Sequence, residues 1–570
     1  MHSPKLRLIT CGLLGVLTGT AVLGRAHAGG VENDCADPYW ASSLRCAAHP
    51  LELPQPPPAS PTLPTQLREF TRVTLNGDLA VRCLDGTRPV IYVDPAEGGP
   101  SSRWLISVTG GGACSAEDLD QNGSFENADA CAALYAEPGE ADEMGTADEP
   151  AMKTLGSVGT SEGLLKPDLQ RNPVFARFHR VRIEKCSYDR FNGRSTHEVS
   201  AIVPGSGGSV SFSLFQHGQK IMRLALEALR GSGAGAPGIA YSSYVADGIG
   251  GVVPQAVQLP SIADATQVVF VGHSGGAHGL YHNIDRLSDA LAAVAGFHGD
   301  VRVIHDANFL PTAENEAAFD PDSPAGLFAQ QFAGSSAQLG SYDGSEFIRL
   351  PSADNRWYFE QYRAWFESEG AALSTIFDTS CAAAHAGSGD QWKCRDRLHV
   401  RLHHETTPAL LREDFLDPNA EHTQNGFGHA LPWGPYGTYG HCTVFGFSPC
   451  PPLLPVGPGS AHEARLLTQA QGFMSGFATQ SELATGADAS GPVPSAFLWM
   501  PECGTHEGTY DDEAFYDIRQ FVGARGMSLR ELAEAFVAAP RTGRHEAWVD
   551  GLTGAVSECG PRLLTDSFEQ

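Results

Sequence analysis

The chain has 570 residues, of which 42% are hydrophobic and 18% charged, and this composition is typical of a globular protein rather than a disordered one. Its 66 acidic residues outnumber its 38 lysines and arginines, so the formal net charge is −28. Because phosphate binding needs a basic surface, this charge excludes nucleic acid as a partner and is typical of a soluble exported protein.

The N-terminus indicates export. Lys5 and Arg7 precede an apolar run from Leu8 to Gly24, which is followed by the small-residue pattern Ala26-His27-Ala28. This order predicts a signal peptide over residues 1–28. The alternative is an uncleaved anchor, but the run is short for a spanning helix of about 20 residues. We therefore expect a secreted or periplasmic protein that has no membrane insertion after signal removal.

The cysteine content also suits an oxidising compartment. Cleavage of the leader removes Cys11 and leaves twelve of the 13 cysteines, an even number that predicts disulfides rather than a metal site. The near-neighbour pairs are Cys35–Cys46, Cys114–Cys131 and Cys442–Cys450. Spacing alone leaves the connectivity open.

The rest of the chain predicts one large α/β domain. Residues 29–66 form a Pro-rich N-terminal arm, and residues 67–570 are expected to form a single α/β-hydrolase-like catalytic domain. A hairpin is expected around Asp85-Gly86. Its two β-like runs are Phe70–Arg82 and Arg88–Val93.

Short apolar runs further along predict buried strands, and two amphipathic segments predict helices. The runs are Trp104–Val108, Val181–Glu184, Gln267–Val271, Val301–Ile304, Thr407–Leu411 and Ala496–Met500, and the helical segments are Gln219–Leu229 and Ser528–Ala538. The fold class is therefore α/β, with a mostly parallel central sheet flanked by helices, long loop insertions and disulfides.

A serine motif follows one of these strands. The pentapeptide Gly272-His273-Ser274-Gly275-Gly276 fits G-x-S-x-G, which places a nucleophilic serine on a sharp turn between a strand and a helix. The motif is short and the chain is rich in glycine, so its context carries the prediction. The strand Gln267–Val271 comes directly before it, and residues 276–291 can form the helix directly after it.

A glycine triplet follows an earlier strand. The run Trp104–Val108 leads into Gly110-Gly111-Gly112, and an acyl-transfer serine needs backbone N–H donors on such a turn to stabilise the developing oxyanion. We expect Gly111, Gly112 and Gly275 to form the oxyanion hole.

These pieces together resemble the pectin acetylesterase and Notum family. The resemblance runs over roughly residues 100 to 540, and its motifs are Trp104 to Cys114 with the glycine triplet, Asn172-Pro173 with Phe175, the serine turn, Asp306 to Phe309, Thr407-Pro408 with Asp417, and Cys503 to His506. The resemblance implies a triad of Ser274, Asp417 and His506. His506 would take the proton of Ser274, and Asp417 would fix the imidazole tautomer. Asp414 and Asp306 remain alternatives for the acid.

Some positions depart from the family pattern. Ala113 stands where the family usually has an aromatic residue, and Gly275 stands where it usually has alanine. These changes leave the chemistry intact and the substrate open.

A second pattern could hold a metal ion. Asp118, Asp120, Asn122, Ser124 and Asp129 occupy ligand positions of a twelve-residue calcium loop, with a turn glycine at position 6. Position 12 is Asp where Glu is usual, and an acidic surface loop is the alternative that the pattern favours. Structural calcium thus remains a hypothesis.

Another cluster carries imidazoles. His399, His403, His404 and Glu405 suggest a metal site, but they lie on a strand-like run without a matching motif. Histidines that are solvated or satisfied in the core are the favoured interpretation.

The sequence therefore predicts a serine carboxylesterase that removes O-acetyl or other short acyl groups from a saccharide or a small alcohol, without an organic cofactor. The alternatives are a lipid- or polyester-directed esterase and a non-catalytic secreted binding protein on a hydrolase scaffold.

Overall fold

The computed structural model describes these parts of the chain: residues 69–110, 145–146, 152–154, 163–202, 209–235, 237–246, 252–307, 377–388, 391–395, 397–414, 494–501, 503, 508–522, 524–549 and 555–557. The predicted signal peptide, the Pro-rich arm, the calcium loop and the three near-neighbour cysteine pairs lie outside these residues, as do Gly111, Gly112, Asp417 and His506.

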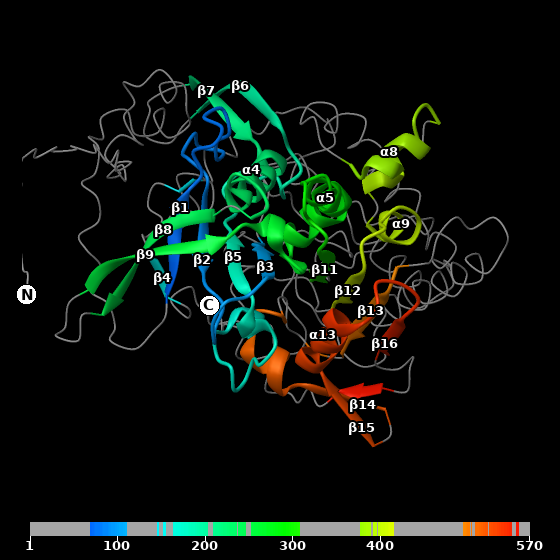
Figure 1. Ribbon diagram of the computed structural model, residues 1–570. Coiled ribbons are helices and arrows are strands. Elements are labelled where there is room, and N and C mark those ends of the chain that lie inside the picture. Colours follow the sequence, from blue (N-terminus) through cyan, green and yellow to red (C-terminus); the bar gives the residue numbers. More distant parts are fainter. Residues whose placement is uncertain are drawn as a thin grey trace, which may run out of the picture.

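A ten-stranded sheet forms the centre of the described fold (Figure 1). In spatial order its strands are β16 (His545–Val549), β13 (Ala496–Met500), β12 (Ala409–Arg412), β11 (Asp300–Asp306), β10 (Gln267–His273), β3 (Arg103–Val108), β5 (His179–Ile183), β2 (Val90–Asp94), β1 (Glu69–Thr74) and β4 (Met152–Thr154). The first seven run parallel, whereas β2, β1 and β4 pair antiparallel at one edge. This sheet confirms the predicted fold class.

The predicted strands agree closely with the observed ones because their residues are apolar and buried. β10 pairs in parallel with β11 on one side and with β3 on the other, so both of its faces and both of its edges are covered. The predicted hairpin joins β1 to β2, although β1 ends at Thr74 rather than Arg82. After Thr74 the chain forms turns, among them one in which Gly86 has φ 97° and its N–H donates to the Cys83 carbonyl.

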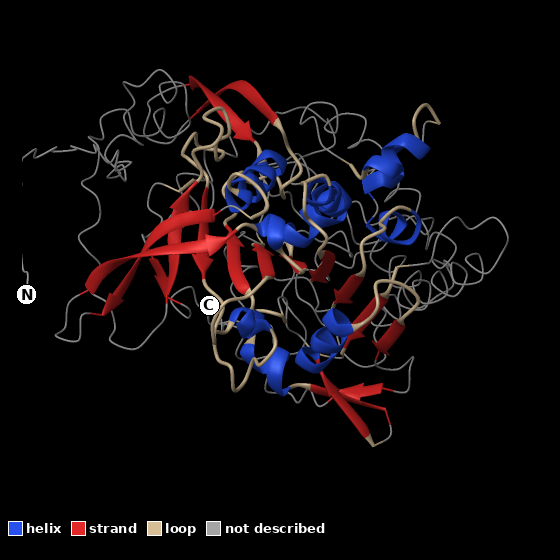
Figure 2. Cartoon of the chain, viewed as in Figure 1, coloured by secondary structure: helices blue, strands red, loops and turns tan. Residues whose placement is uncertain are grey.

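Helices cover both faces of the sheet (Figure 2). On one face lie α4 (Gly218–Arg230) and α5 (Gly275–Ala292), and their apolar side chains pack with Trp104, Ile106 and Phe270. On the other face α13 (Leu529–Ala538) packs with Leu105 and Val269. Because side chains alternate along a strand, neighbouring residues of β3 serve the two cores separately.

Capping interactions fix where α13 begins. The Ser528 hydroxyl accepts from the Glu531 N–H, and the Glu531 carboxylate accepts from the Ser528 N–H, which is a capping box. Three smaller sheets flank the core: β6 (Ser195–Ile202) with β7 (Ser209–Gln216), β8 (Pro237–Ala246) with β9 (Val252–Pro260), and β15 (Arg525–Ser528) with β14 (Arg519–Val522) and β17 (Ala555–Ser557).

Several short helices complete the described elements. They are η2 (Gly163–Leu165), η3 (Phe175–Arg177), η4 (Ile262–Asp264), α8 (Thr379–Ala384), η8 (Gln391–Arg395), α9 (Arg397–His403) and η9 (Glu513–Asp517). Within the described ranges, no helix is both long and apolar enough to cross a membrane.

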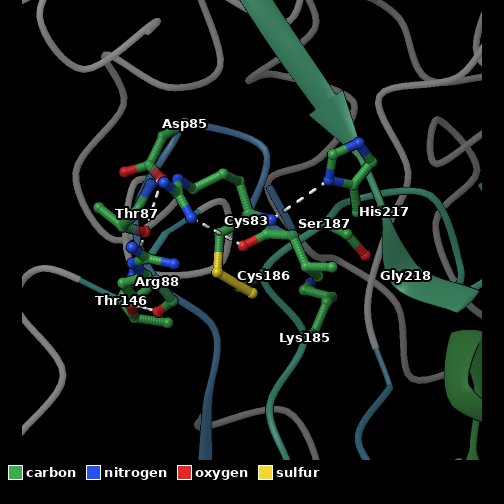
Figure 3. The surroundings of a disulfide bond; sticks show 12 residues. Cys83, Asp85, Thr87, Arg88, Thr146, Lys185, Cys186, Ser187, His217 and Gly218 are labelled. Atoms are coloured by element: carbon green, nitrogen blue, oxygen red, sulfur yellow. Dashed lines mark hydrogen bonds between the residues drawn. A yellow bond between two sulfur atoms is a disulfide. The ribbon is translucent and has the colours of Figure 1, made fainter. Parts of the chain in front are cut away.

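Two disulfides join described cysteines, as the cysteine content predicted, and the three near-neighbour pairs stay a prediction because they lie outside the described residues. Cys83 bonds to Cys186, 103 residues away, and Cys381 bonds to Cys394. Figure 3 shows the first bond, with Asp85 beside it accepting from the Thr87 N–H and hydroxyl at 2.8 and 2.6 Å. This disulfide ties the turn between β1 and β2 to the loop after β5.

Candidate active site

Ser274 occupies a strained turn between β10 and α5. Its φ of 47° and ψ of −115° lie outside the regions that residues with a side chain normally adopt. The Ser274 N–H donates to the Asp306 carbonyl at 2.9 Å, and the Ser274 carbonyl accepts from the His278 N–H at 3.1 Å. A backbone held in this way is typical of a nucleophile turn at the top of a parallel sheet.

The glycines of the motif are required by close packing. A Cβ atom on Gly276 would lie 2.2 Å from the Val108 carbonyl oxygen and 2.6 Å from that of Thr109. A Cβ atom on Gly272 would lie 2.6 Å from the backbone of Ala277. Glycine at both positions therefore lets α5 begin directly against the end of β3.

The glycine triplet begins at the same sheet edge. Gly272 is the parallel partner of Val108, the last residue of β3, and Thr109 and Gly110 follow it. The Thr109 N–H donates to the Ile183 carbonyl, which fixes the end of β3 against β5. The first residue of the triplet thus follows a strand end that touches the serine turn.

A buried ionic network lies beneath the serine turn. Asp306 ends β11, and its carboxylate accepts from Arg412 Nη1 at 3.1 Å, from the Thr509 N–H at 2.7 Å and from the Thr509 hydroxyl. Arg412 also pairs with Asp414 at 2.5 Å, and His273 Nδ1 lies 3.4 Å from the Asp306 carboxylate. Two of the three candidate triad acids therefore share one arginine.

The network keeps Asp306 ionised. Burial by itself would raise the pKa of Asp306, but Arg412, His273 and Thr509 together outweigh it and lower the pKa to about 2. The charged side chain of Asp306 is therefore fixed by its partners. This holds the end of β11 in place, where the Asp306 carbonyl accepts from the Ser274 N–H.

The chain after the predicted catalytic histidine returns to this network. Tyr510 stacks on His273 with ring centroids 3.4 Å apart, and its hydroxyl is hydrogen-bonded to Ser107 of β3. A Cβ atom on Gly508 would lie 2.6 Å from the Arg412 guanidinium. Residues 508–510 are thereby fixed against the residue that precedes Ser274.

The loop after β5 contacts the first turns of α5. Tyr188, Arg190 and Phe191 all have φ between 47° and 61°, and a Cβ atom on Gly279 would lie 2.6 Å from the Arg190 carbonyl oxygen. Strained non-glycine residues of this kind are typical of functional sites. The loop therefore packs against α5 close to its N-terminal end.

Asp189 holds that loop together. Its carboxylate accepts from the Ser187 hydroxyl at 2.6 Å and from the N–H groups of Phe191, Gly193 and Gly218 at 2.8 to 3.1 Å. Complete burial raises the pKa of Asp189 to about 6, although these four hydrogen bonds act in the opposite direction. Sequence reasoning missed this residue, because its role depends on the folded shape of the loop and on one donor, Gly218, that is 29 residues away.

The histidine cluster does not lie on a strand, contrary to the prediction. His399 and His403 lie on the helix α9, and His404 and Glu405 follow it. The alternation of Leu398, Val400 and Leu402 with polar residues resembles a strand, but seven residues are too few to separate the two periods. The Glu405 carboxylate lies 3.4 Å from His305 and 3.5 Å from Arg401, so it pairs with these two residues rather than with the histidines of the cluster.

The chain is similar to two groups of known proteins. Residues 65–234 match the family model of pectinacetylesterases, and the match ends before Ser274. Two crystal forms of the Wnt deacylase Notum from Drosophila are similar structures. The first is 14% identical in sequence, with a TM-score of 0.47, and the match covers 85% of this chain and 97% of that chain. The second is 15% identical, with a TM-score of 0.45, and the match covers 86% of this chain and 100% of that chain.

The family match supports the class of protein that the sequence predicted, which is a carboxylic ester hydrolase. Within that class the chain is similar to the pectin acetylesterase and Notum family, as its motifs predicted.

Proposed function

We propose that the protein is an exported serine esterase that removes O-acetyl or other short acyl groups from a saccharide or a small alcohol. The Ser274 hydroxyl attacks the ester carbonyl and forms an acyl-serine, while the alcohol leaves with a proton from His506. Water then attacks the acyl-serine, releases the carboxylic acid and restores the serine. Asp417 orients His506, and the N–H groups of Gly111, Gly112 and Gly275 stabilise the oxyanion.

The observation that carries this proposal is the conformation of Ser274. It has a positive φ, it stands at the carboxyl edge of a parallel sheet, and its neighbour Gly276 is pressed against the end of β3. A surface turn gains nothing from such strain, whereas a nucleophile gains exposure beside backbone N–H donors.

The flanking segments support the other two members of the triad. His506 is three residues from Thr509, which donates to Asp306, and Asp417 is three residues from Asp414, which pairs with Arg412. Three residues of chain span about 10 Å at most, and this short spacing supports the assignment of both residues to the proposed triad. Asp306 and Asp414 are already bound to Arg412, which favours Asp417 as the acid.

Export is part of the same proposal. The N-terminal leader pattern and the two disulfides among the described residues both favour an oxidising compartment. Mass analysis of the protein recovered outside the cytoplasm should give a mature N-terminus at Gly29.

Hydrolysis of p-nitrophenyl acetate tests the enzyme activity. Ser274→Ala should lose nearly all of the rate, whereas Ser102→Ala, an exposed serine at the opposite end of β3, should keep it. Equal rates for the wild type and Ser274→Ala would contradict the proposal and favour a binding protein. A series of esters from acetate to long acyl chains would then separate a short-acyl esterase from a lipid-directed one.

A further inference from the structure

Four histidines gather around two short helices next to α5. His385 follows α8, His399 and His403 lie on α9, and His404 follows α9. The ring centroid of His385 lies 5.0 Å from that of His399 and 5.8 Å from that of His404. The rings of His399 and His404 are 5.2 Å apart. This cluster is independent of the proposed esterase chemistry.

Three of these rings present nitrogen atoms to one another. One ligand atom each from His385, His399 and His404 lies within 4.8 Å of the others, and the two Nε2 atoms of His385 and His399 are 2.9 Å apart. Two nitrogens that bind one tetrahedral zinc ion at 2.0–2.1 Å are themselves about 3.3 Å apart. Small rotations of the side chains would therefore bring the three nitrogens to ligand distance.

A hydrogen-bond chain sets the tautomer of His404. The Ser380 hydroxyl donates its proton to Asp378 at 2.7 Å, so its oxygen accepts from His404 Nδ1 at 3.1 Å. His404 Nε2 then carries a lone pair, and among the described residues this buried atom has no hydrogen-bond partner. A carboxylate or hydroxyl behind the non-ligating nitrogen is the usual arrangement around a metal-binding histidine.

The two helices that carry the rings are held rigidly. The Cys381–Cys394 disulfide joins α8 to η8, directly before α9, and Asp378 caps α8 by accepting from the N–H groups of Ser380 and Cys381. The Cys381 sulfur lies within the same group of atoms, but as a disulfide it offers no thiolate.

The helix α5 anchors both ends of this segment. Arg286 Nη2 donates to the Phe377 carbonyl at 2.7 Å, and Asp285 accepts from the N–H groups and hydroxyls of Thr406 and Thr407. A site on fixed elements keeps its ligands close together before the ion arrives, which reduces the ordering cost of binding.

We propose that His385, His399 and His404 bind one divalent transition-metal ion of the zinc type, which fastens α8 to α9. Three imidazoles suit zinc, copper and nickel, whereas calcium and magnesium prefer oxygen ligands. The neighbouring carboxylate Glu405 is turned to His305 and Arg401 and does not belong to the ligand group.

Calorimetric titration of the full-length protein with zinc tests this site. The protein should carry no polyhistidine tag and should first be stripped with a chelator. We expect one zinc ion per chain and a rise in melting temperature. His385→Ala, His399→Ala and His404→Ala should each weaken zinc binding at least about tenfold, and Ser380→Ala should weaken it about tenfold through the tautomer of His404.

The matched control is His298→Ala, which removes an exposed histidine outside the cluster and should leave zinc binding unchanged. If a cluster variant fails to fold, the visible spectrum of cobalt bound to the wild type decides the question, because nitrogen ligands at one tetrahedral site give intense bands. Absence of zinc and cobalt binding by the wild type would overturn the proposal, as would equal affinity in the wild type and all three histidine variants.

Discussion

The first turn and the middle of α5 contact two polar clusters that are built on different principles. At the N-terminal end the serine turn rests on paired charges, in which Asp306 and Asp414 share Arg412. Further along, Asp285 and Arg286 hold a segment in which imidazoles face one another and a disulfide supplies the rigidity. An ion-paired network can hold a strained backbone, whereas a group of imidazole nitrogens is suited to receive a metal ion.

The identity of the triad acid gives the sharpest test of the cluster around the serine turn. Asp417→Asn should lower kcat by about 10⁴-fold, because the histidine would be held in the wrong tautomer, and should leave the melting temperature almost unchanged. Asp414→Asn should instead lower the stability, because it removes a buried partner of Arg412. The reverse pattern, with a stable but inactive Asp414→Asn, would assign the acid to Asp414.

The buried network should dominate stability. Arg412→Met should lower the free energy of unfolding by about 3–5 kcal/mol, since it leaves two buried carboxylates without their partner. Arg541→Met removes an ion pair to Asp300 in which the arginine is 48% exposed, and it should cost about 1 kcal/mol or less. Urea unfolding measures both, and equal losses would show that burial of the network is not what stabilises the strand ends.

The two buried aspartates near the serine turn should affect the pH dependence of stability in opposite directions. Asp306 has a pKa of about 2, below the ordinary 3.8, so its contribution is present above about pH 4 and is lost as the pH falls toward 2. Asp189 has a pKa of about 6, so the folded state retains a proton that the unfolded state has released. The protein should therefore lose about 3 kcal/mol of stability as the pH rises from 4 to 6.

Urea unfolding of the wild type and Asp189→Asn between pH 3 and 7 isolates this second effect. The variant should lack the loss between pH 4 and 6 and should keep the loss below pH 4. Parallel curves for the two proteins over the whole range would show that Asp189 is ionised in the folded protein already at pH 4.

Much of the serine turn and its flanking elements could be predicted from the sequence because their signals are local. The apolar run of β10, the G-x-S-x-G pentapeptide and the helix after it follow one another without a gap, and all three are observed. The contacts of Asp306 with Arg412 and Thr509 and the Cys83–Cys186 disulfide could not be predicted, because their partners are separated by about 100 residues or more. In the histidine cluster the local signal was misleading. The alternating residues 398–402 predicted a strand, but they form the helix α9, which follows a disulfide-linked segment.

The most direct test of the central claim is labelling with a fluorophosphonate, which reacts with an activated serine. Peptide mapping of the labelled wild type should place one label on the peptide that contains Ser274, and Ser274→Ala should take up none while Ser102→Ala labels normally. A label on another serine, or equal labelling of the wild type and Ser274→Ala, would contradict the assignment of Ser274 as the nucleophile.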